Sequence, residues 1–245
     1  MPHVFDTMGT VASLISSADE ATIAAVEGVF RAADERFSLY RPDSELSRIA
    51  ARTLTLMDSS PTLRDTYASA LDWRHRTDGA FTPNRPDGVV DLNGIVKAHA
   101  IRDAGIVLEL AGCRDFCLNV GGDILVAGVQ RDGNPWTVGL VDPRNSGALV
   151  CSIVVDGTRR AVATSGSAER GDHIWLGGTT EQADFLQASV VADDIVTADV
   201  LATAIIAGGG GTLDDITSRW DVDVLTVNRA GELLATPGLR QALAA

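Results

Sequence analysis

The sequence predicts an α+β protein, with helices and strands segregated along the chain. Apolar residues recur at helical spacing through most of residues 1–112, and the pattern changes to short strands from residue 116 onward. Repeated βαβ units, which would indicate a parallel sheet, do not occur in this pattern. The 245 residues suffice for one or two domains with a buried core. We therefore expect a single domain over 1–245, with a two-lobed organisation, 1–112 and 113–245, as the alternative.

The N-terminal part is expected to hold one strand followed by four helices. The strand covers 9–16, and Ser17 and Glu20 fit a capping box at the start of the first helix. That helix has apolar residues at helical spacing, namely Ile23, Val26, Phe30, Ala33 and Phe37. The later helices cover about 45–51, 61–77 and 95–111. A loop with two prolines at 81–88 and a short extended stretch at 89–92 separate the last two helices.

Short strands are expected over most of the C-terminal part. Their ranges are 116–120, 124–129, 135–141, 149–155, 160–164, 173–176 and 186–192. A helix from 197 to about 207 follows, and four glycines at 208–211 break it from a final helix at 213–219. A hairpin around 229–231 closes the chain.

Composition and charge exclude several classes of function. The formal net charge is -13, whereas proteins that bind nucleic acid or anionic membranes need a basic surface. The N-terminus has no basic segment before an apolar run, and no stretch approaches 18 apolar residues, so we expect a cytoplasmic protein without a membrane anchor. Three cysteines indicate no disulfide framework. An acidic protein that binds a polyanion needs backbone N–H groups, a cation or a placed lysine.

Lys97 is the only lysine, since 19 of the 20 lysine and arginine residues are arginines. It follows Asp91 and falls in the first turn of a predicted helix, where the helix dipole disfavours a cation. An anion bound nearby would explain this position, and Asp91 is able to accept a hydrogen bond from a ligand. The alternatives are the chance survival of one lysine and an ordinary solvated side chain.

Two further motifs are small and polar. Residues 119–123 (Asn-Val-Gly-Gly-Asp) lie between two apolar strands, and paired glycines allow either a close approach to a ligand or simply a tight hairpin. Residues 164–167 (Thr-Ser-Gly-Ser) follow a strand and precede His173. A serine hydrolase is not indicated, because no nucleophile elbow is present.

Asp199 and Thr203 form the most suggestive pair. They are four residues apart on a predicted helix and therefore lie on one face. A carboxylate and a hydroxyl are hard oxygen ligands that suit Mg²⁺ when water and phosphate complete its coordination. The alternative is that Asp199 balances the dipole at a helix start and that Thr203 bonds to its own backbone.

The motifs occur in an order that resembles the ApbE family of FAD:protein FMN transferases. They are Met8-Gly9-Thr10, 37–48 (Phe-Ser-Leu-Tyr-Arg-Pro-Asp-Ser-Glu-Leu-Ser-Arg), Gly79-Ala80-Phe81, 91–97, 119–123, 164–166, His173-Ile174 and 199–203. The resemblance extends from Met8 to about Gly208. It implies an α+β fold with a helical N-terminal part, a following antiparallel sheet and an FAD cleft between them.

The resemblance also implies an activity and a set of site residues. Members of the family split FAD and transfer FMN through a phosphoester bond to a threonine or serine of an acceptor protein, and AMP is released. The implied FAD contacts are Met8, Tyr40, Ala80, Phe81, Thr82, Asp91, Lys97 and Ile174, and Asp123 is assigned to the same ligand site. The implied Mg²⁺ ligands are the side chains of Asp199 and Thr203 and the backbone carbonyl of Gly94, with His173 as the base.

The chain departs from the family pattern at two places. The family usually has an aspartate where Thr82 stands and a longer segment before Asp91. After His173-Ile174 it usually continues with Asp-Pro-x-x-Gly, where this chain has 175–178 (Trp-Leu-Gly-Gly). Three alternatives to a transferase therefore stay open: an FAD pyrophosphatase that uses water as acceptor, a non-catalytic FAD-binding protein, and a structural or interaction module.

Overall fold

A computed structural model of the protein describes residues 1–166 and 184–244. The helices are α1 (Glu20–Phe37), α2 (Glu45–Ala50), α3 (Pro61–Arg76), α4 (Asn93–Leu110), α5 (Ile195–Arg219) and α6 (Pro237–Gln241). The strands are β1 (His3–Thr7), β2 (Thr10–Ile15), β3 (Phe116–Val120), β4 (Asp123–Ala127), β5 (Trp136–Asp142), β6 (Asn145–Val155), β7 (Ala161–Gly166), β8 (Phe185–Ala192), β9 (Asp223–Asn228) and β10 (Leu233–Ala235). The predicted strand at 173–176 lies outside the described residues.

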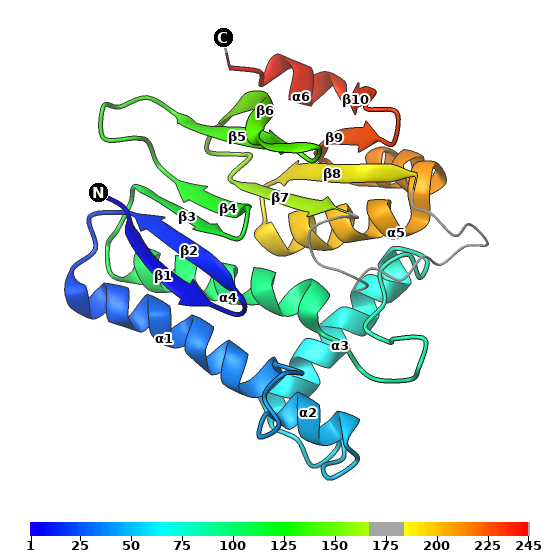
Figure 1. The fold of residues 1–245 in the computed structure, drawn as a ribbon. Coiled ribbons are helices and arrows are strands. Elements are labelled where there is room, and N and C mark those ends of the chain that lie inside the picture. The colour runs from blue at the N-terminus through cyan, green and yellow to red at the C-terminus, as the bar shows by residue number, and fades with distance from the viewer. Residues whose placement is uncertain (167–183, 245) are drawn as a thin grey trace.

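Eight strands form one antiparallel sheet in the order β1-β2-β3-β4-β7-β8-β9-β10, and β5 and β6 form a separate two-stranded sheet. Figure 1 shows α1, α4 and α5 along one face of the large sheet, with the β5–β6 hairpin and α6 toward the other. The predicted α+β class with an antiparallel sheet is confirmed. The N-terminal part is not purely helical, because β1 and β2 join the sheet through the pairing of β2 with β3.

Successive side chains along each strand point to opposite faces of the sheet, and a separate hydrophobic core lies on each face. The main core lies between the sheet and the helices α1, α4 and α5, and it includes Phe30, Leu108 and Phe116. The second core lies under the β5–β6 hairpin and includes Trp136 and Ile153. Odd-numbered positions of β4 therefore face α4, and this places Asp123 on the same side of the sheet as the main core.

The observed helix caps confirm two predicted helix starts and correct a third. Ser44 and Ser60 cap α2 and α3, and each accepts a hydrogen bond from the backbone N–H three residues later, at 3.0 and 3.3 Å. The capping box at Ser17 is wrong, because α1 begins only at Glu20. Asp19 is its N-cap and accepts from the N–H of Thr22 at 2.8 Å.

The expected break at the four glycines is a kink inside α5. Only Gly209 leaves helical geometry, with φ 69° and ψ -154°. The Asp184 carboxylate accepts from the N–H of Gly210 at 3.0 Å and occupies the space that a side chain at 209 would need. Glycine is therefore required at the kink. Among the described residues, α5 is also a helix long and apolar enough to cross a membrane, yet 67% of that stretch is buried inside the fold, as in a core helix.

The short terminal elements β1 and α6 are absent from the sequence prediction. In β1 the inward residues are His3, Phe5 and Thr7. His3 contacts Glu27 at 2.7 Å, and Phe5 lies against Phe30. Only one of these inward residues is a large apolar side chain, so the alternation gives a weak strand signal. α6 has five residues, too few for a helical pattern to show.

Candidate functional site

Two adjacent hairpin turns mark one end of the large sheet. Met8 and Gly9 join β1 to β2 with φ of 47° and 72°, and Gly121 and Gly122 join β3 to β4 with φ of 59° and 92°. Positive φ at both central residues is what a type I′ turn requires. The N–H of Gly121 donates to the carbonyl of Val11 at 3.0 Å, which ties the two turns together. Residues 119–123 therefore do form a tight hairpin, and Met8 adopts a backbone conformation that is uncommon for a residue other than glycine.

The structure pairs Lys97 with Asp123. The Lys97 ammonium forms an ion pair with Asp123 Oδ2, and the two residues are 6% and 0% exposed. Asp123 Oδ1 accepts from the backbone N–H of Thr164 at 3.2 Å. The alternative of a solvated lysine is therefore wrong. The placement in the first helical turn is also wrong, because α4 begins at Asn93 and Lys97 is its fifth residue.

The loop before α4 packs on glycines of two helices. A Cβ at Gly94 would lie 3.0 Å from Cε2 of Phe81, so the absence of a side chain there leaves room for the Phe81 ring. A Cβ at Gly208 would lie 3.3 Å from the Cβ of Ala80. Thr82 is half-buried, and its hydroxyl accepts from a backbone N–H two residues on at 3.2 Å. The residues 80–82 thus lie where α4 begins and where α5 kinks.

Asp91 presents a buried carboxylate oxygen at the start of α4. The residue is 8% exposed, and Oδ1 accepts from the N–H of Asn93 at 2.9 Å. Oδ2 is buried and has no hydrogen-bond partner within the described ranges. Because an unsatisfied buried acceptor is unfavourable, this oxygen is suited to a ligand that donates an N–H or O–H.

Asp199 and Thr203 lie one turn apart on α5, as predicted. Asp194 caps this helix by accepting from the N–H of Thr197 at 2.8 Å, so Asp199 lies in the second turn and is not needed to cap the helix. Asp199 is 5% exposed, and the Thr203 hydroxyl lies 3.2 Å from the hydroxyl of Ser165 on β7. Asp199 is therefore not in the first turn of the helix, and Thr203 has a hydrogen-bonding partner outside its own helix.

The chemistry of these donors fits the implied Mg²⁺. A buried carboxylate and a nearby hydroxyl supply hard oxygen ligands, and Mg²⁺ keeps several waters or phosphate oxygens as its other ligands. No group of three or more histidine, cysteine or acidic residues suited to a metal occurs in the described part of the chain.

Contacts join most of the predicted motifs at one end of the sheet. The loop 79–81 contacts α4 and α5, Lys97 contacts Asp123, and β7 contacts both Asp123 and Thr203. Tyr40 lies in the loop between α1 and α2 with 79% exposure, and its place relative to this group stays a prediction. His173 and Ile174 lie outside the described residues. Ser165 is absent from the predicted site residues, although the motif at 164–166 contains it.

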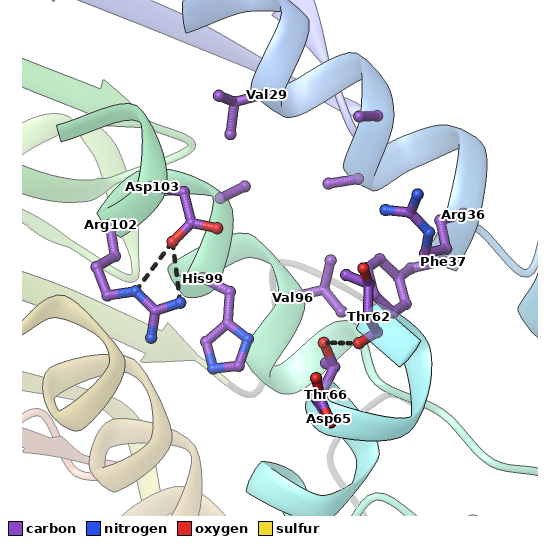
Figure 2. A pocket seen from close by; sticks show the side chains of 13 residues that line it. Val29, Arg36, Phe37, Thr62, Asp65, Thr66, Val96, His99, Arg102 and Asp103 are labelled. Atoms are coloured by element: carbon purple, nitrogen blue, oxygen red, sulfur yellow. Dashed lines mark hydrogen bonds and ion pairs between the residues drawn. The ribbon is translucent and has the colours of Figure 1, made fainter. Parts of the chain in front are cut away.

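A separate cavity of about 470 Å³ lies on another face of α4, between α1, α3 and α4. Figure 2 shows His99, Arg102 and Asp103 of α4 on one side of it, with Arg102 and Asp103 joined at 2.9 Å. Burial lowers the pKa of His99 to about 4, and Arg102 adds to this effect, whereas Asp103 and Asp194 oppose it. His99 therefore stays neutral at pH 7, and this cavity is distinct from the motif residues around Lys97.

Comparison with known proteins identifies the family. A sequence model described as the ApbE family matches residues 8–86 and 82–224. The chain belongs to the ApbE family. A relative from Rhodobacter capsulatus named FAD:protein FMN transferase is 30% identical over 172 residues, which are 66% of this chain and 32% of the relative. A relative of the same name from Vibrio cholerae is 25% identical over 75% of this chain and 72% of its own length. This chain thus spans only about a third of the length of the Rhodobacter capsulatus relative.

Solved structures show the same fold at low sequence identity. The flavin transferase ApbE from Vibrio cholerae superposes with a TM-score of 0.81 at 20% identity, covering 99% of both chains. The ApbE protein from Thermotoga maritima gives a TM-score of 0.79 at 17% identity, covering 100% of this chain and 99% of that one. These similarities confirm the expected ApbE-type α+β fold.

Proposed function

We propose that this chain is an FAD:protein FMN transferase that splits FAD and transfers FMN to a threonine or serine of an acceptor protein. The observation that carries the proposal is the convergence of the family motifs on one end of the sheet, where a buried cation, a buried acceptor oxygen and a carboxylate–hydroxyl pair come from different elements. The names of the relatives support the same activity.

The proposed FAD-binding residues differ in the kind of group that they offer to the substrate. Lys97 supplies the positive charge that an acidic chain needs near the pyrophosphate of FAD. Asp91 offers an acceptor to a donor group of the substrate. The remaining contacts proposed from the family are Met8, Tyr40, Ala80, Phe81, Thr82 and Ile174, with Asp123 in the same site.

Asp199 and Thr203, with the carbonyl of Gly94, would hold Mg²⁺. When bound, this ion supplies positive charge that stabilises the pyrophosphate and the leaving AMP. The buried position of Asp199 keeps its carboxylate out of bulk water, which strengthens its interaction with a cation.

His173 is proposed as the base that takes the proton from the acceptor hydroxyl. A histidine is able to be neutral near pH 7 and so to accept a proton. The hydroxyl oxygen forms a bond to the FMN phosphorus, the bond from that phosphorus to the oxygen of AMP breaks, and AMP leaves. The acceptor protein and FAD are therefore the proposed partners, with no role for nucleic acid. Cytoplasmic location and the lack of a membrane anchor stay predictions.

One reaction separates transfer from its alternatives. Purified chain is incubated with FAD and Mg²⁺, with and without a peptide that carries the acceptor threonine, and AMP, FMN and peptide-bound flavin fluorescence are measured. We expect flavinylated peptide and AMP in equal amounts, and no labelling of a control peptide with valine in place of threonine. AMP with free FMN and no labelled peptide would instead show the pyrophosphatase. Bound FAD without AMP would show a non-catalytic flavin-binding protein.

A further inference from the structure

We propose that Asp123 is a positioning residue, which holds the ammonium of Lys97 toward FAD without contacting FAD itself. The proposal rests on the proposed function, because it assumes that Lys97 binds the substrate. It gives Asp123 a different role from the direct ligand contact expected from the sequence. Its basis is the buried ion pair between the two side chains and the 0% exposure of Asp123.

Stability alone does not account for a buried ion pair at this place. Removing two charges from water is unfavourable, and replacing such pairs by apolar side chains of similar volume is often neutral or stabilising. The pair borders the main hydrophobic core, since Asp123 precedes by two residues Leu125, a core residue on the same face of β4. A core of this kind could be filled with aliphatic side chains, so the charged pair calls for another explanation.

The identity of the cation supports a functional role. All other basic side chains among the 20 lysine and arginine residues are arginines, yet this position keeps a lysine. An ammonium is a compact charge with three N–H donors, whereas a guanidinium is a planar fork that needs more room. The ion pair with Asp123 Oδ2 engages one side of the ammonium, and its three N–H groups point in different directions, so that some of them are able to face a bound anion.

Asp123 is itself held by the sheet. It is the first residue of β4, directly after the Gly121-Gly122 turn, and its Oδ1 accepts from the N–H of Thr164 on β7. An aspartate side chain is short, so two fixed points leave its carboxylate little freedom. The fixed carboxylate in turn restricts the flexible side chain of Lys97. Less side-chain conformational entropy is therefore lost when Lys97 binds an anion.

A double-mutant cycle on FAD affinity tests this role. The variants are Asp123→Asn, Lys97→Met and the double variant, and FAD binding is followed by quenching of flavin fluorescence. We expect Lys97→Met to weaken binding by about 10- to 100-fold, the range of a charge-assisted hydrogen bond. Asp123→Asn should weaken it by about tenfold, and the double variant should be no weaker than Lys97→Met alone, because Asp123 acts only through Lys97.

Controls keep the cycle interpretable. Asp115→Asn also removes a carboxylate that accepts a backbone N–H, at 2.9 Å from Val129, and should leave FAD affinity unchanged. Since breaking a buried pair can unfold a protein, Asp123→Glu provides a second variant that keeps the charge and moves the carboxylate. It should fold and still bind FAD more weakly than wild type.

Two results would overturn the proposal and are distinguishable. Additive losses in the double variant, or wild-type affinity in folded Asp123→Glu and Asp123→Asn, would show that Asp123 does not act through Lys97. A wild-type chain that binds no FAD at all would overturn the proposed function and the positioning role together.

Discussion

The two halves of α4 pack against the same sheet in different ways. In the C-terminal half the contacts are apolar: Ile101, Ala104 and Leu108 are fully buried, and Gly105 lies against Leu125. In the N-terminal half, Gly94 lies under Phe81, and Lys97 makes a buried ion pair with the first residue of β4. One helix therefore contains a segment with only apolar contacts to the sheet and a segment with a buried ion pair to it.

From this contrast we predict that residues for stability and residues for binding lie in different halves of one helix. Burial of apolar side chains is the main favourable term in folding, whereas buried ion pairs contribute little or nothing net. Substitutions in the C-terminal half of α4 should therefore change the free energy of unfolding. Substitutions at the proposed site residues of α4 and α5 should change FAD binding or turnover. The following variants test that separation, from the largest expected effect to the smallest.

The largest effect is expected at Asp199, which is buried on α5. Asp199→Asn should lower Mg²⁺-dependent AMP release by about a thousandfold, roughly 4 kcal/mol, because the carboxylate is the charged donor of the proposed Mg²⁺ site. The release is measured by chromatography at saturating FAD. Asp215→Asn is the control on the same helix, since Asp215 pairs with Arg219 at 2.7 Å far along α5. An unchanged rate in Asp199→Asn would make the metal assignment wrong.

The next effect concerns the apolar half. Leu108 is 0% exposed, and Leu108→Ala should lower the free energy of unfolding by about 2–5 kcal/mol because it leaves a cavity. Urea unfolding measures this change, and FAD affinity of the folded variant should stay within twofold of wild type. Leu110→Ala provides the control, because Leu110 is 83% exposed two residues away. A large loss of FAD affinity in Leu108→Ala would contradict the claim that the C-terminal half of α4 contributes to stability and not to FAD binding.

Two glycines give a matched pair on the same helix. A Cβ at Gly105 would lie 2.6 Å from Leu125 Cδ2, so Gly105→Ala should destabilise the fold by about 1–3 kcal/mol through overpacking. A Cβ at Gly94 would lie 3.0 Å from the Phe81 ring, a contact that a small shift of the ring relieves. Gly94→Ala should therefore keep near-wild-type stability and raise the KM for FAD. Thermal unfolding and steady-state kinetics of both variants measure these effects. A loss of stability in Gly94→Ala together with a raised KM for FAD in Gly105→Ala would contradict the comparison.

The smallest effect is the pH dependence that comes from His99. Its pKa in the folded protein is lowered to about 4, below the value of 6.5 that the unfolded chain has. The unfolded state therefore binds more protons between these values, so stability is full above pH 6.5 and is lost as the pH falls toward 4. Because the imidazole is partly exposed, we expect a loss of about 1–2 kcal/mol rather than the full linkage value.

Urea unfolding at pH 7 and pH 4.5 measures this loss in wild type and in His99→Gln. The variant should lose less stability than wild type between the two pH values. His75→Gln, an exposed histidine on α3, should behave like wild type. Equal pH dependence in His99→Gln and wild type would show that His99 is not the titrating group.

Periodicity and capping chemistry made most of the fold predictable. Ser44 and Ser60 satisfy N–H groups at helix starts, and such local bonds are visible in sequence. The kink at Gly209 is not, because it depends on Asp184, which is 25 residues away in the chain. The sequence prediction places the N-cap of α1 at Ser17, whereas the structure has it at Asp19, a boundary error of the kind that two neighbouring cap residues produce.

The candidate site was predictable as a set of motifs but not as an arrangement. Helical spacing places Asp199 and Thr203 on one face, and the structure agrees. The pairing of Lys97 with Asp123 joins residues from a helix and a strand, and spacing carries no information about such contacts. The same holds for Ser165 and Thr203, whose hydroxyls meet only because β7 lies against α5.

Parallel titration of FAD into wild type, Lys97→Met and Leu108→Ala tests the central claim most directly. Flavin fluorescence is measured below the unfolding range of all three proteins. The account predicts saturable binding of one FAD per chain in wild type, a similar affinity in Leu108→Ala, and an affinity weakened by about 10- to 100-fold in Lys97→Met. Equal affinity in wild type and Lys97→Met would contradict the claim that the N-terminal half of α4 binds the substrate.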